Sequence, residues 1–163
     1  MQEKQVMVVG LDDSAHSFYA LEWTLDHFFT PPQNGLFKLI VVHAKTAPST
    51  VIATPMAFGT ADIIPLVDAD LKRVAQRVVD KAKEVCEKKS VPDVEVEVME
   101  GDARNVMCEA VEKFHASVLV LGSHGYGAFK RAVLGSVSDY CSHHANSTVM
   151  IVKQPKTTAT SPK

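Results

Sequence analysis

Five short runs rich in valine and isoleucine alternate along this chain with longer segments of helical periodicity. The runs are apolar on both faces, which is typical of strands buried in a parallel sheet. Neighbouring parallel strands need a crossover of a dozen or more residues, usually a helix. The alternation therefore predicts one α/β domain with a doubly wound, five-stranded parallel sheet and helices on both faces. The predicted strands span residues 5–10, 37–44, 94–99, 118–121 and 148–152.

Apolar residues spaced three and four positions apart predict four amphipathic helices between these runs. They cover residues 18–28, 67–85, 103–115 and 137–145, and Asp102 is the expected N-cap of the third. The segment 45–61 contains two prolines and a glycine and is expected to be a loop. It is either a mobile flap beside a binding site or a disordered surface loop.

A glycine-bearing stretch, Gly122-Ser-His-Gly125, directly follows the fourth predicted strand, and Gly135-Ser136 comes nine residues later. Glycines let the backbone approach an oxyanion closely. The N–H groups and dipole at the start of the following helix favour negative charge. Ser136 is expected at the start of that helix, where its hydroxyl caps the helix or donates to a phosphate. The pattern thus predicts a phosphate-binding loop.

Two common phosphate motifs do not match this loop. A Walker-type loop requires Gly-Lys followed by Ser or Thr, and the chain contains no Gly-Lys pair. The dinucleotide fingerprint begins at Gly125 and Gly127 but has Lys130 in place of its third glycine, and it lies late in the chain. The first predicted strand is followed by Leu11-Asp12-Asp13-Ser14, with no glycine-rich turn.

The loop pattern, with Asp12-x-Ser14 after the first strand and His43 at the end of the second, resembles the nucleotide-binding branch of the universal stress protein family. The resemblance covers about residues 4–153, and residues 126–140 are similar to plant members. It implies the strand order 3-2-1-4-5, in which the first and fourth strands flank the reversal of winding. Ligands of such sheets bind at that reversal, beside the carboxyl ends of the strands.

The resemblance implies that ATP or AMP binds in this crevice. Asp12 would accept hydrogen bonds from the ribose, or else act as a turn acid for the first helix. Ala44 would offer backbone groups to adenine, and His43 is expected to order the end of its strand. The expected nucleotide-binding residues are Leu11, Asp12, Ala44, Gly122, Ser123, His124, Gly125, Gly135, Ser136 and Val137.

Several charged or titratable side chains near the expected phosphates have open roles. His124 either donates to a phosphate or positions the loop. Lys130 and Arg131 either contact the terminal phosphate or face solvent. A carboxylate near a phosphate repels it unless a cation lies between them, so Asp12 or Asp13 would hold a cation such as Mg²⁺.

The expected function is that of an adenine-nucleotide-binding regulator or sensor in a stress response. Phosphoryl transfer needs a positioned water and a charge clamp. The Walker lysine is absent, and no residue in the sequence is marked as a base for water. Binding is therefore expected rather than turnover, and the alternatives are a slow ATP hydrolase and a redox-controlled, chaperone-like oligomer.

Composition restricts the partners and the location. The formal net charge of −2 does not favour nucleic-acid binding, which depends on neutralising phosphates. No apolar stretch approaches the roughly 20 residues of a membrane span, and the amino terminus does not resemble a signal peptide. We expect no membrane partner and a cytoplasmic, or also nuclear, location. The domain is expected over residues 1–153, and the tail 154–163, rich in Pro, Ser, Thr and Lys, is expected to be disordered.

The last predicted strand and the cysteines bear on assembly. Thr148–Val152 is apolar at its centre and is predicted to be an edge strand, a type that tends to pair. The resemblance implies a two-fold homodimer through this strand. Cys86, Cys108 and Cys141 are odd in number and widely spaced, so neither a disulfide framework nor a zinc site is indicated. They are expected to be buried, inert thiols, or else sites of redox sensing.

Overall fold

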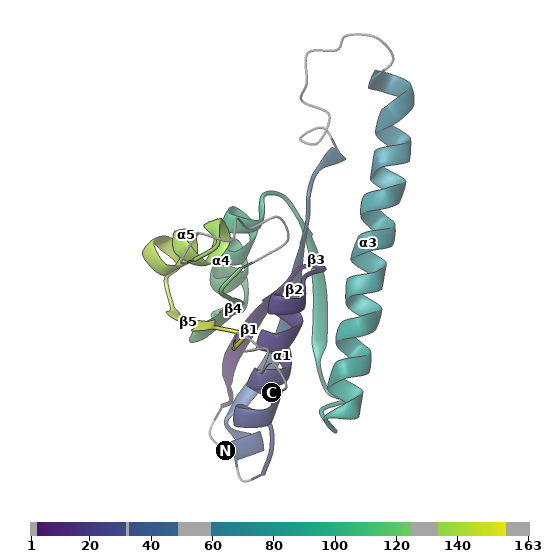
Figure 1. Cartoon of the computed structure of the whole chain (residues 1–163). Coiled ribbons are helices and arrows are strands. Elements are labelled where there is room, and N and C mark those ends of the chain that lie inside the picture. Colours follow the sequence, from purple (N-terminus) through teal and green to yellow (C-terminus); the bar gives the residue numbers. More distant parts are fainter. Residues whose placement is uncertain (1–2, 32, 49–59, 125–133, 156–163) are drawn as a thin grey trace, which may run out of the picture.

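The structure is a computed structural model that describes residues 3–31, 33–48, 60–124 and 134–155. Strands and helices alternate along the chain, as predicted (Figure 1). The strands are β1 (Gln5–Leu11), β2 (Phe37–Lys45), β3 (Glu95–Glu100), β4 (Val118–Gly122) and β5 (Thr148–Val152). The helices are α1 (Ala15–Phe28), α3 (Thr60–Lys88), α4 (Ala103–Phe114) and α5 (Ser136–His144), with a short 3-10 helix η1 (Gln33–Gly35).

The five strands form one parallel sheet in the order β3-β2-β1-β4-β5, which confirms the predicted topology. β1 is central, and its Val8 lies beside Ile40 of β2 and Leu119 of β4. The chain winds outward from β1 to β3 and then returns to the other side of β1 with β4. The carboxyl ends of β1 and β4 therefore flank the reversal of winding, where ligands of this fold class bind.

Each face of the sheet has its own apolar core. Met7 and Val9 of β1 pack with Leu21 of α1 on one face. Val8, which points the opposite way, packs with Val106 of α4 on the other face. α1 and α3 thus cover one face, and α4 and α5 cover the other. Burying each such side chain stabilises the fold by about 1.5–3 kcal/mol.

Four strands end one residue later than the apolar runs predicted. β1 ends at Leu11, β2 at Lys45, β3 at Glu100 and β4 at Gly122. These residues continue the parallel ladder, because Lys45 pairs with Glu100 and Gly122 pairs with Val152. In β2 and β3 the apolar pattern stops before a charged residue, Lys45 or Glu100, whereas the backbone ladder continues through it. The carboxyl edge of the sheet carries the predicted site.

The helix α3 is longer than the predicted helix and begins at Thr60 instead of Val67. Its sheet-facing stripe starts near Ala75 and Val78, which are buried, whereas Ile63 and Leu66 are exposed. The helix also contains Pro65. The first turns therefore lack the periodicity that comes from packing on a sheet, and Figure 1 shows them extending past the sheet, beside the end of β2.

Candidate functional site

The loops that follow β1 and β4 are in contact at the carboxyl edge of the sheet. A Cβ atom placed on Gly122 would lie 2.9 Å from the carbonyl oxygen of His16 in α1, so only a glycine allows this close approach. The ring of His16 meets the ring of His124 edge-on, with 5.3 Å between their centroids. The fold therefore brings the two predicted ligand loops to one crevice.

His16 and His124 share a further property in this crevice. The Nδ1 atom of each ring is shielded from solvent and has no hydrogen-bond partner in the part of the chain that the structure describes. An imidazole N–H can donate to an anionic oxygen. The sequence pattern does not single out His16. The available signal is its place in the first turn of the helix that follows the Asp12 loop.

The turn between β1 and α1 is held by short polar side chains. Asp12 Oδ1 accepts from the backbone N–H of Ser14 at 2.9 Å, and Ser14 is the N-cap of α1. Ser17 Oγ donates to the carbonyl oxygen of Asp12 at 2.9 Å. Asp12 thus has the turn role that its sequence position suggested as an alternative. Its contact with ribose stays a prediction.

His43 joins the ends of β1 and β2. Its Nδ1–H donates to the carbonyl oxygen of Leu11 at 2.9 Å, and the ring is buried. This confirms that His43 orders the strand end. Ala44, the next residue, is half-buried and pairs with Met99 of β3. The expected contact between the Ala44 backbone and adenine stays a prediction. The expected contact between Leu11 and the nucleotide also stays a prediction.

The start of α5 is tied to the end of β4. The backbone N–H of Gly135 donates to the carbonyl oxygen of Ser123 at 2.6 Å. The hydroxyl of Ser138 lies 3.2 Å from the same oxygen and 3.0 Å from the carbonyl oxygen of Gly135. Ser138 is buried and is a site residue that the sequence pattern does not reveal.

Gly135, not Ser136, is the N-cap of α5, and it makes no side-chain cap bond. The expected capping role of the Ser136 hydroxyl is therefore wrong, because Ser136 is already the first helical residue. The first N–H groups of a helix have no intrahelical partner and lie at the positive end of its dipole. Ser136 and Val137 lie in this first turn and can present their N–H groups to an anion.

Three predicted site residues, Gly125, Lys130 and Arg131, lie outside the described residues. The same holds for most of the predicted tail.

Asp13 points toward α3 and pairs with Arg77, with 2.8 Å between Oδ2 and Nη2. In the described ranges, no group of three or more His, Cys, Asp or Glu side chains is placed to hold a metal ion. The Asp13 carboxylate thus fits an ion pair better than a magnesium site. Mg²⁺ through Asp12 stays a prediction.

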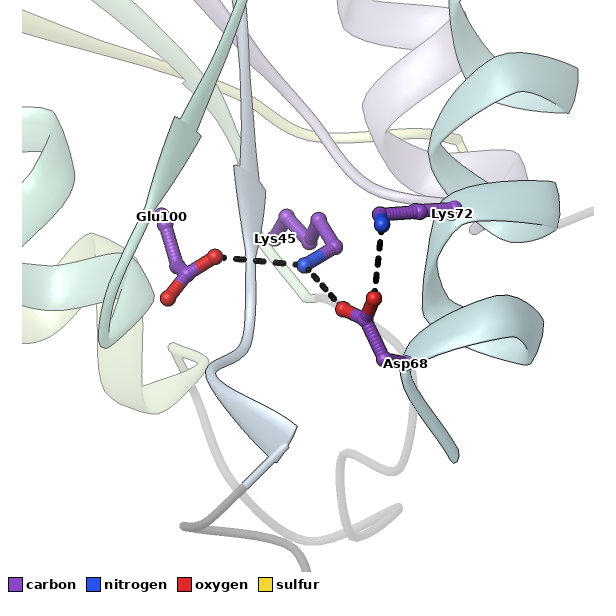
Figure 2. A network of polar contacts seen from close by, with 4 residues as sticks. All are labelled: Lys45, Asp68, Lys72 and Glu100. Carbon is purple, nitrogen blue, oxygen red and sulfur yellow. Dashed lines mark hydrogen bonds and ion pairs between the residues drawn. The ribbon is translucent and has the colours of Figure 1, made fainter. Parts of the chain in front are cut away.

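Lys45 lies beyond Ala44 and is buried in a charged cluster at the same edge (Figure 2). Its Nζ is 3.0 Å from Asp68 Oδ1 of α3 and 3.2 Å from Glu100 Oε2 of β3. Asp68 also pairs with Lys72 at 2.7 Å. The cluster therefore joins β2, β3 and α3 beside the crevice.

The ion pairs of this cluster shift the ionisation of its members. The hydrogen bond with Asp68 is the largest cause that raises the pKa of Lys45 above its usual 10.5. The hydrogen bond from Lys72, followed by that from Lys45, lowers the pKa of Asp68 below its usual 3.8. Both groups are charged at neutral pH. Nothing in the sequence pattern connects Lys45 with Asp68; only the i,i+4 spacing of Asp68 and Lys72 was visible.

A wide hollow of about 540 Å³ lies elsewhere, along α3. Side chains of that single helix line it, and all are polar or charged, so it lacks the converging elements of a typical ligand site. The residues that line this hollow are Arg73, Gln76, Arg77, Asp80, Lys81 and Glu84. We place the candidate site at the crevice instead, where β1, α1, β4 and α5 meet.

Comparison with known proteins agrees with this architecture. The model of the universal stress protein family matches residues 4–153. The Arabidopsis thaliana protein "Universal stress protein PHOS34" is 28% identical over 165 residues, which cover 90% of this chain and 61% of that protein. The chain thus spans less than two thirds of the length of the first curated relatives it matches.

Solved structures share the fold. Universal stress protein UspA from Lactobacillus plantarum has a TM-score of 0.75 at 17% identity, covering 93% of this chain and 99% of that one. A universal stress protein family member from Arabidopsis thaliana, solved with AMP bound, has a TM-score of 0.62 at 21% identity, covering 93% of each chain. Within the described residues, no helix is both long and apolar enough to cross a membrane.

Proposed function

The chain belongs to the universal stress protein family, and on that basis we propose that it binds an adenine nucleotide at the crevice between β1 and β4. The observation that carries the proposal is the contact between the two loops there, made by Gly122 against the backbone of His16. It gathers helix N-termini around one space, together with imidazole nitrogens that have no hydrogen-bond partner among the described residues. The AMP-bound relative from Arabidopsis thaliana supports adenine as the base.

The proposed binding mode places the phosphates against α5. The first turn of α5 supplies N–H groups and a positive dipole end, which are the usual features of an anion site. His124 adds an imidazole whose Nδ1 is buried and lacks a partner in the described ranges. The adenosine would then extend toward the ends of β1 and β2, at Leu11, Asp12 and Ala44. Lys130 and Arg131 are the further phosphate contacts that we propose.

We propose a regulatory role for binding, in which ATP or AMP biases the conformation or partner contacts of the protein in a stress response. The described residues support binding over hydrolysis, because Asp13 is engaged by Arg77. A slow ATP hydrolase and a chaperone-like oligomer remain the alternative functions. The cytoplasmic or nuclear location expected from the sequence stays a prediction.

We also propose a homodimer through β5. This strand is an edge of the sheet, and Val149, Met150 and Ile151 are only partly buried in the single chain. An apolar edge strand leaves unpaired backbone groups beside apolar side chains, which favours pairing with a second copy. A two-fold arrangement would use the same strand from both chains.

Ligand binding is tested by thermal unfolding of the purified protein with AMP, ADP, ATP or cyclic AMP. A ligand at 100 times its Kd stabilises the native state by about 2.7 kcal/mol, which raises the unfolding temperature. Gly135→Val should abolish the shift, because a branched side chain would crowd the expected phosphate position. Gly35→Val is the control, because Gly35 lies at the opposite end of the sheet. A Cβ atom at Gly35 would meet no described atom within 4 Å. If a folded Gly135→Val protein keeps the full shift, the proposed phosphate site is wrong.

A further inference from the structure

We propose that Cys108 and Cys141 form a reversible disulfide within the chain, with a peroxide as the oxidant, and that this bond ties α5 to α4. The pair is distinct from the crevice. It links α4 and α5, the two helices that cover one face of the sheet. The N-cap of α5, Gly135, is also the residue whose N–H donates to the carbonyl oxygen of Ser123 after β4.

Because α4 packs against α5, Cys141 of α5 faces the turn of α4 that precedes Cys108. The Sγ atom of Cys141 lies 3.9 Å from the carbonyl oxygen of Arg104. Arg104 is four residues before Cys108, so the two lie one above the other on α4. Side chains on a helix lean toward its N-terminus, and the Cys108 side chain therefore leans toward the turn that Cys141 contacts.

Two further observations support this placement. The guanidinium of Arg104 lies over the ring of Tyr140, 5.8 Å from its centroid, so consecutive residues of α5 face the same turn of α4. Burial raises the pKa of the Cys141 thiol to about 12, and the charge of Cys108 and a hydrogen bond with its side chain contribute to this shift. Both cysteines also belong to the same apolar cluster, in which Cys141 is buried and Cys108 packs against it.

The two sulfur atoms differ in their access to solvent, which sets the order of the chemistry. Cys141 is fully buried, whereas Cys108 is partly exposed. Thiolates are the reactive species, so a buried thiol with a high pKa reacts slowly with an oxidant in solution. Cys108 is thus the residue that meets the peroxide, and Cys141 is the residue that resolves it.

The reaction is balanced over two steps. The Cys108 sulfur attacks one peroxide oxygen, the O–O bond breaks, and a sulfenic acid and one water molecule form. The Cys141 sulfur then attacks the Cys108 sulfur, the S–O bond breaks, and the hydroxyl leaves with the Cys141 proton as a second water molecule. Two thiols are oxidised to one disulfide, and hydrogen peroxide is reduced to two water molecules.

The third cysteine provides a matched control. Cys86 is buried in the apolar cluster on the other face of the sheet, with Val78 and Ala82 of α3. Burial raises the pKa of its thiol to about 11. Cys86 should therefore remain a thiol under conditions that oxidise the pair.

The test treats the purified chain with hydrogen peroxide, alkylates the remaining thiols in denaturant, and maps the peptides without reductant. The expected product is a linked peptide pair containing Cys108 and Cys141, with a loss of two hydrogen atoms per chain that dithiothreitol reverses. Cys86→Ala should form the same link, and Cys108→Ala should not. Closing a loop of roughly 30 residues should raise the unfolding temperature by roughly 5–10 °C.

The proposal is overturned if Cys108 in the unaltered chain reaches sulfinic acid without forming the link, or if the linked peptides contain Cys86. It is also overturned if the disulfide joins two chains, which electrophoresis without reductant would detect. These readouts do not require nucleotide binding. A failure here leaves the proposed function untouched, and a chain that binds no nucleotide still tests the disulfide.

Discussion

The backbone N–H of Gly135 donates a 2.6 Å hydrogen bond to the carbonyl oxygen of Ser123, which joins the two ends of the segment between β4 and α5. The hydroxyl of Ser138 reaches the same carbonyl oxygen from the first turns of α5. The base of the proposed phosphate loop is therefore fixed by backbone and side-chain contacts that do not depend on ligand. Such preorganisation lowers the entropic cost of binding.

Removing the Ser138 hydroxyl should weaken nucleotide binding. Ser138→Ala deletes the side-chain contact with Ser123 and should raise the Kd for AMP several-fold, while the free energy of unfolding falls by about 1 kcal/mol. Ser142→Ala is the matched control on the same helix, because its hydroxyl also contacts the carbonyl oxygen three residues earlier, at Asp139, but is exposed. Calorimetry with AMP checks both variants. Equal affinities for the two variants would contradict the role given to Ser138.

A methyl group at Gly122 should destabilise the fold. The Cβ atom of Gly122→Ala would lie 2.9 Å from the His16 carbonyl oxygen, and backbone cannot move aside cheaply. We expect a loss of about 1–3 kcal/mol in the free energy of unfolding, measured by urea titration. Gly35→Ala, which has open space, should change the free energy by less than about 1 kcal/mol. Similar losses at both positions would refute the close approach at Gly122.

Stability should fall at low pH through Asp68. Its pKa is lowered, first by Lys72 and then by Lys45, so its contribution is complete above pH 3.8, the usual value, and is lost as pH falls through the folded-state pKa. The stability difference between the unaltered chain and Asp68→Asn should therefore narrow as the pH falls below about 3.8. Asp70→Asn is the control, since Asp70 pairs with Arg73 at the exposed surface of the same helix. Urea titrations above and below this pH measure the difference in free energy of unfolding. A difference that stays constant with pH would contradict the predicted stabilisation by ionised Asp68.

Lys45, the buried lysine of the cluster, has the opposite pH dependence. The pKa of Lys45 is raised, chiefly by Asp68, so its contribution is complete below pH 10.5 and is lost as pH rises through the folded-state pKa. Between these limits the ion pair of Lys45 with Asp68 keeps its full contribution to stability.

The dimer should depend on β5 and not on the opposite edge. Met150→Asp places a charge in the centre of the proposed interface and should weaken the dimer at least about tenfold, because a buried, unpaired carboxylate is costly. Val98→Asp on β3, the other edge strand, should leave assembly unchanged, since Val98 is exposed in the single chain. Sedimentation at micromolar concentration tests this. A monomeric parent protein would contradict the interface.

Hydrolysis of ATP should be slower than about 1 s⁻¹, the lower end of the usual enzyme range. The described residues offer no metal-binding cluster, and Asp13 is paired with Arg77. Phosphate release from purified protein with ATP and Mg²⁺ measures the rate. Turnover above that limit, lost in Arg131→Ala or Asp13→Ala, would replace the binding proposal with an enzymatic one.

The sequence pattern was sufficient for the architecture. Strand and helix periodicities are local properties, and five apolar runs separated by helices admit few parallel topologies. The family resemblance then selected the order 3-2-1-4-5, which the structure confirms. The spacing from Gly122 to Gly135 also predicts a phosphate-binding segment after β4, and this stays a prediction.

Contacts between side chains far apart in the chain were decided by the tertiary structure. His16 meets His124 because α1 packs against the end of β4, and Lys45 meets Asp68 because α3 extends past the sheet. Ser136 is not the N-cap of α5, since the helix begins one residue earlier than the apolar pattern indicates, and the hydroxyl of Ser138 contacts the end of β4 instead. Strand register and helix rotation set such contacts, and a one-dimensional pattern specifies which face is buried but not which polar atoms meet across it.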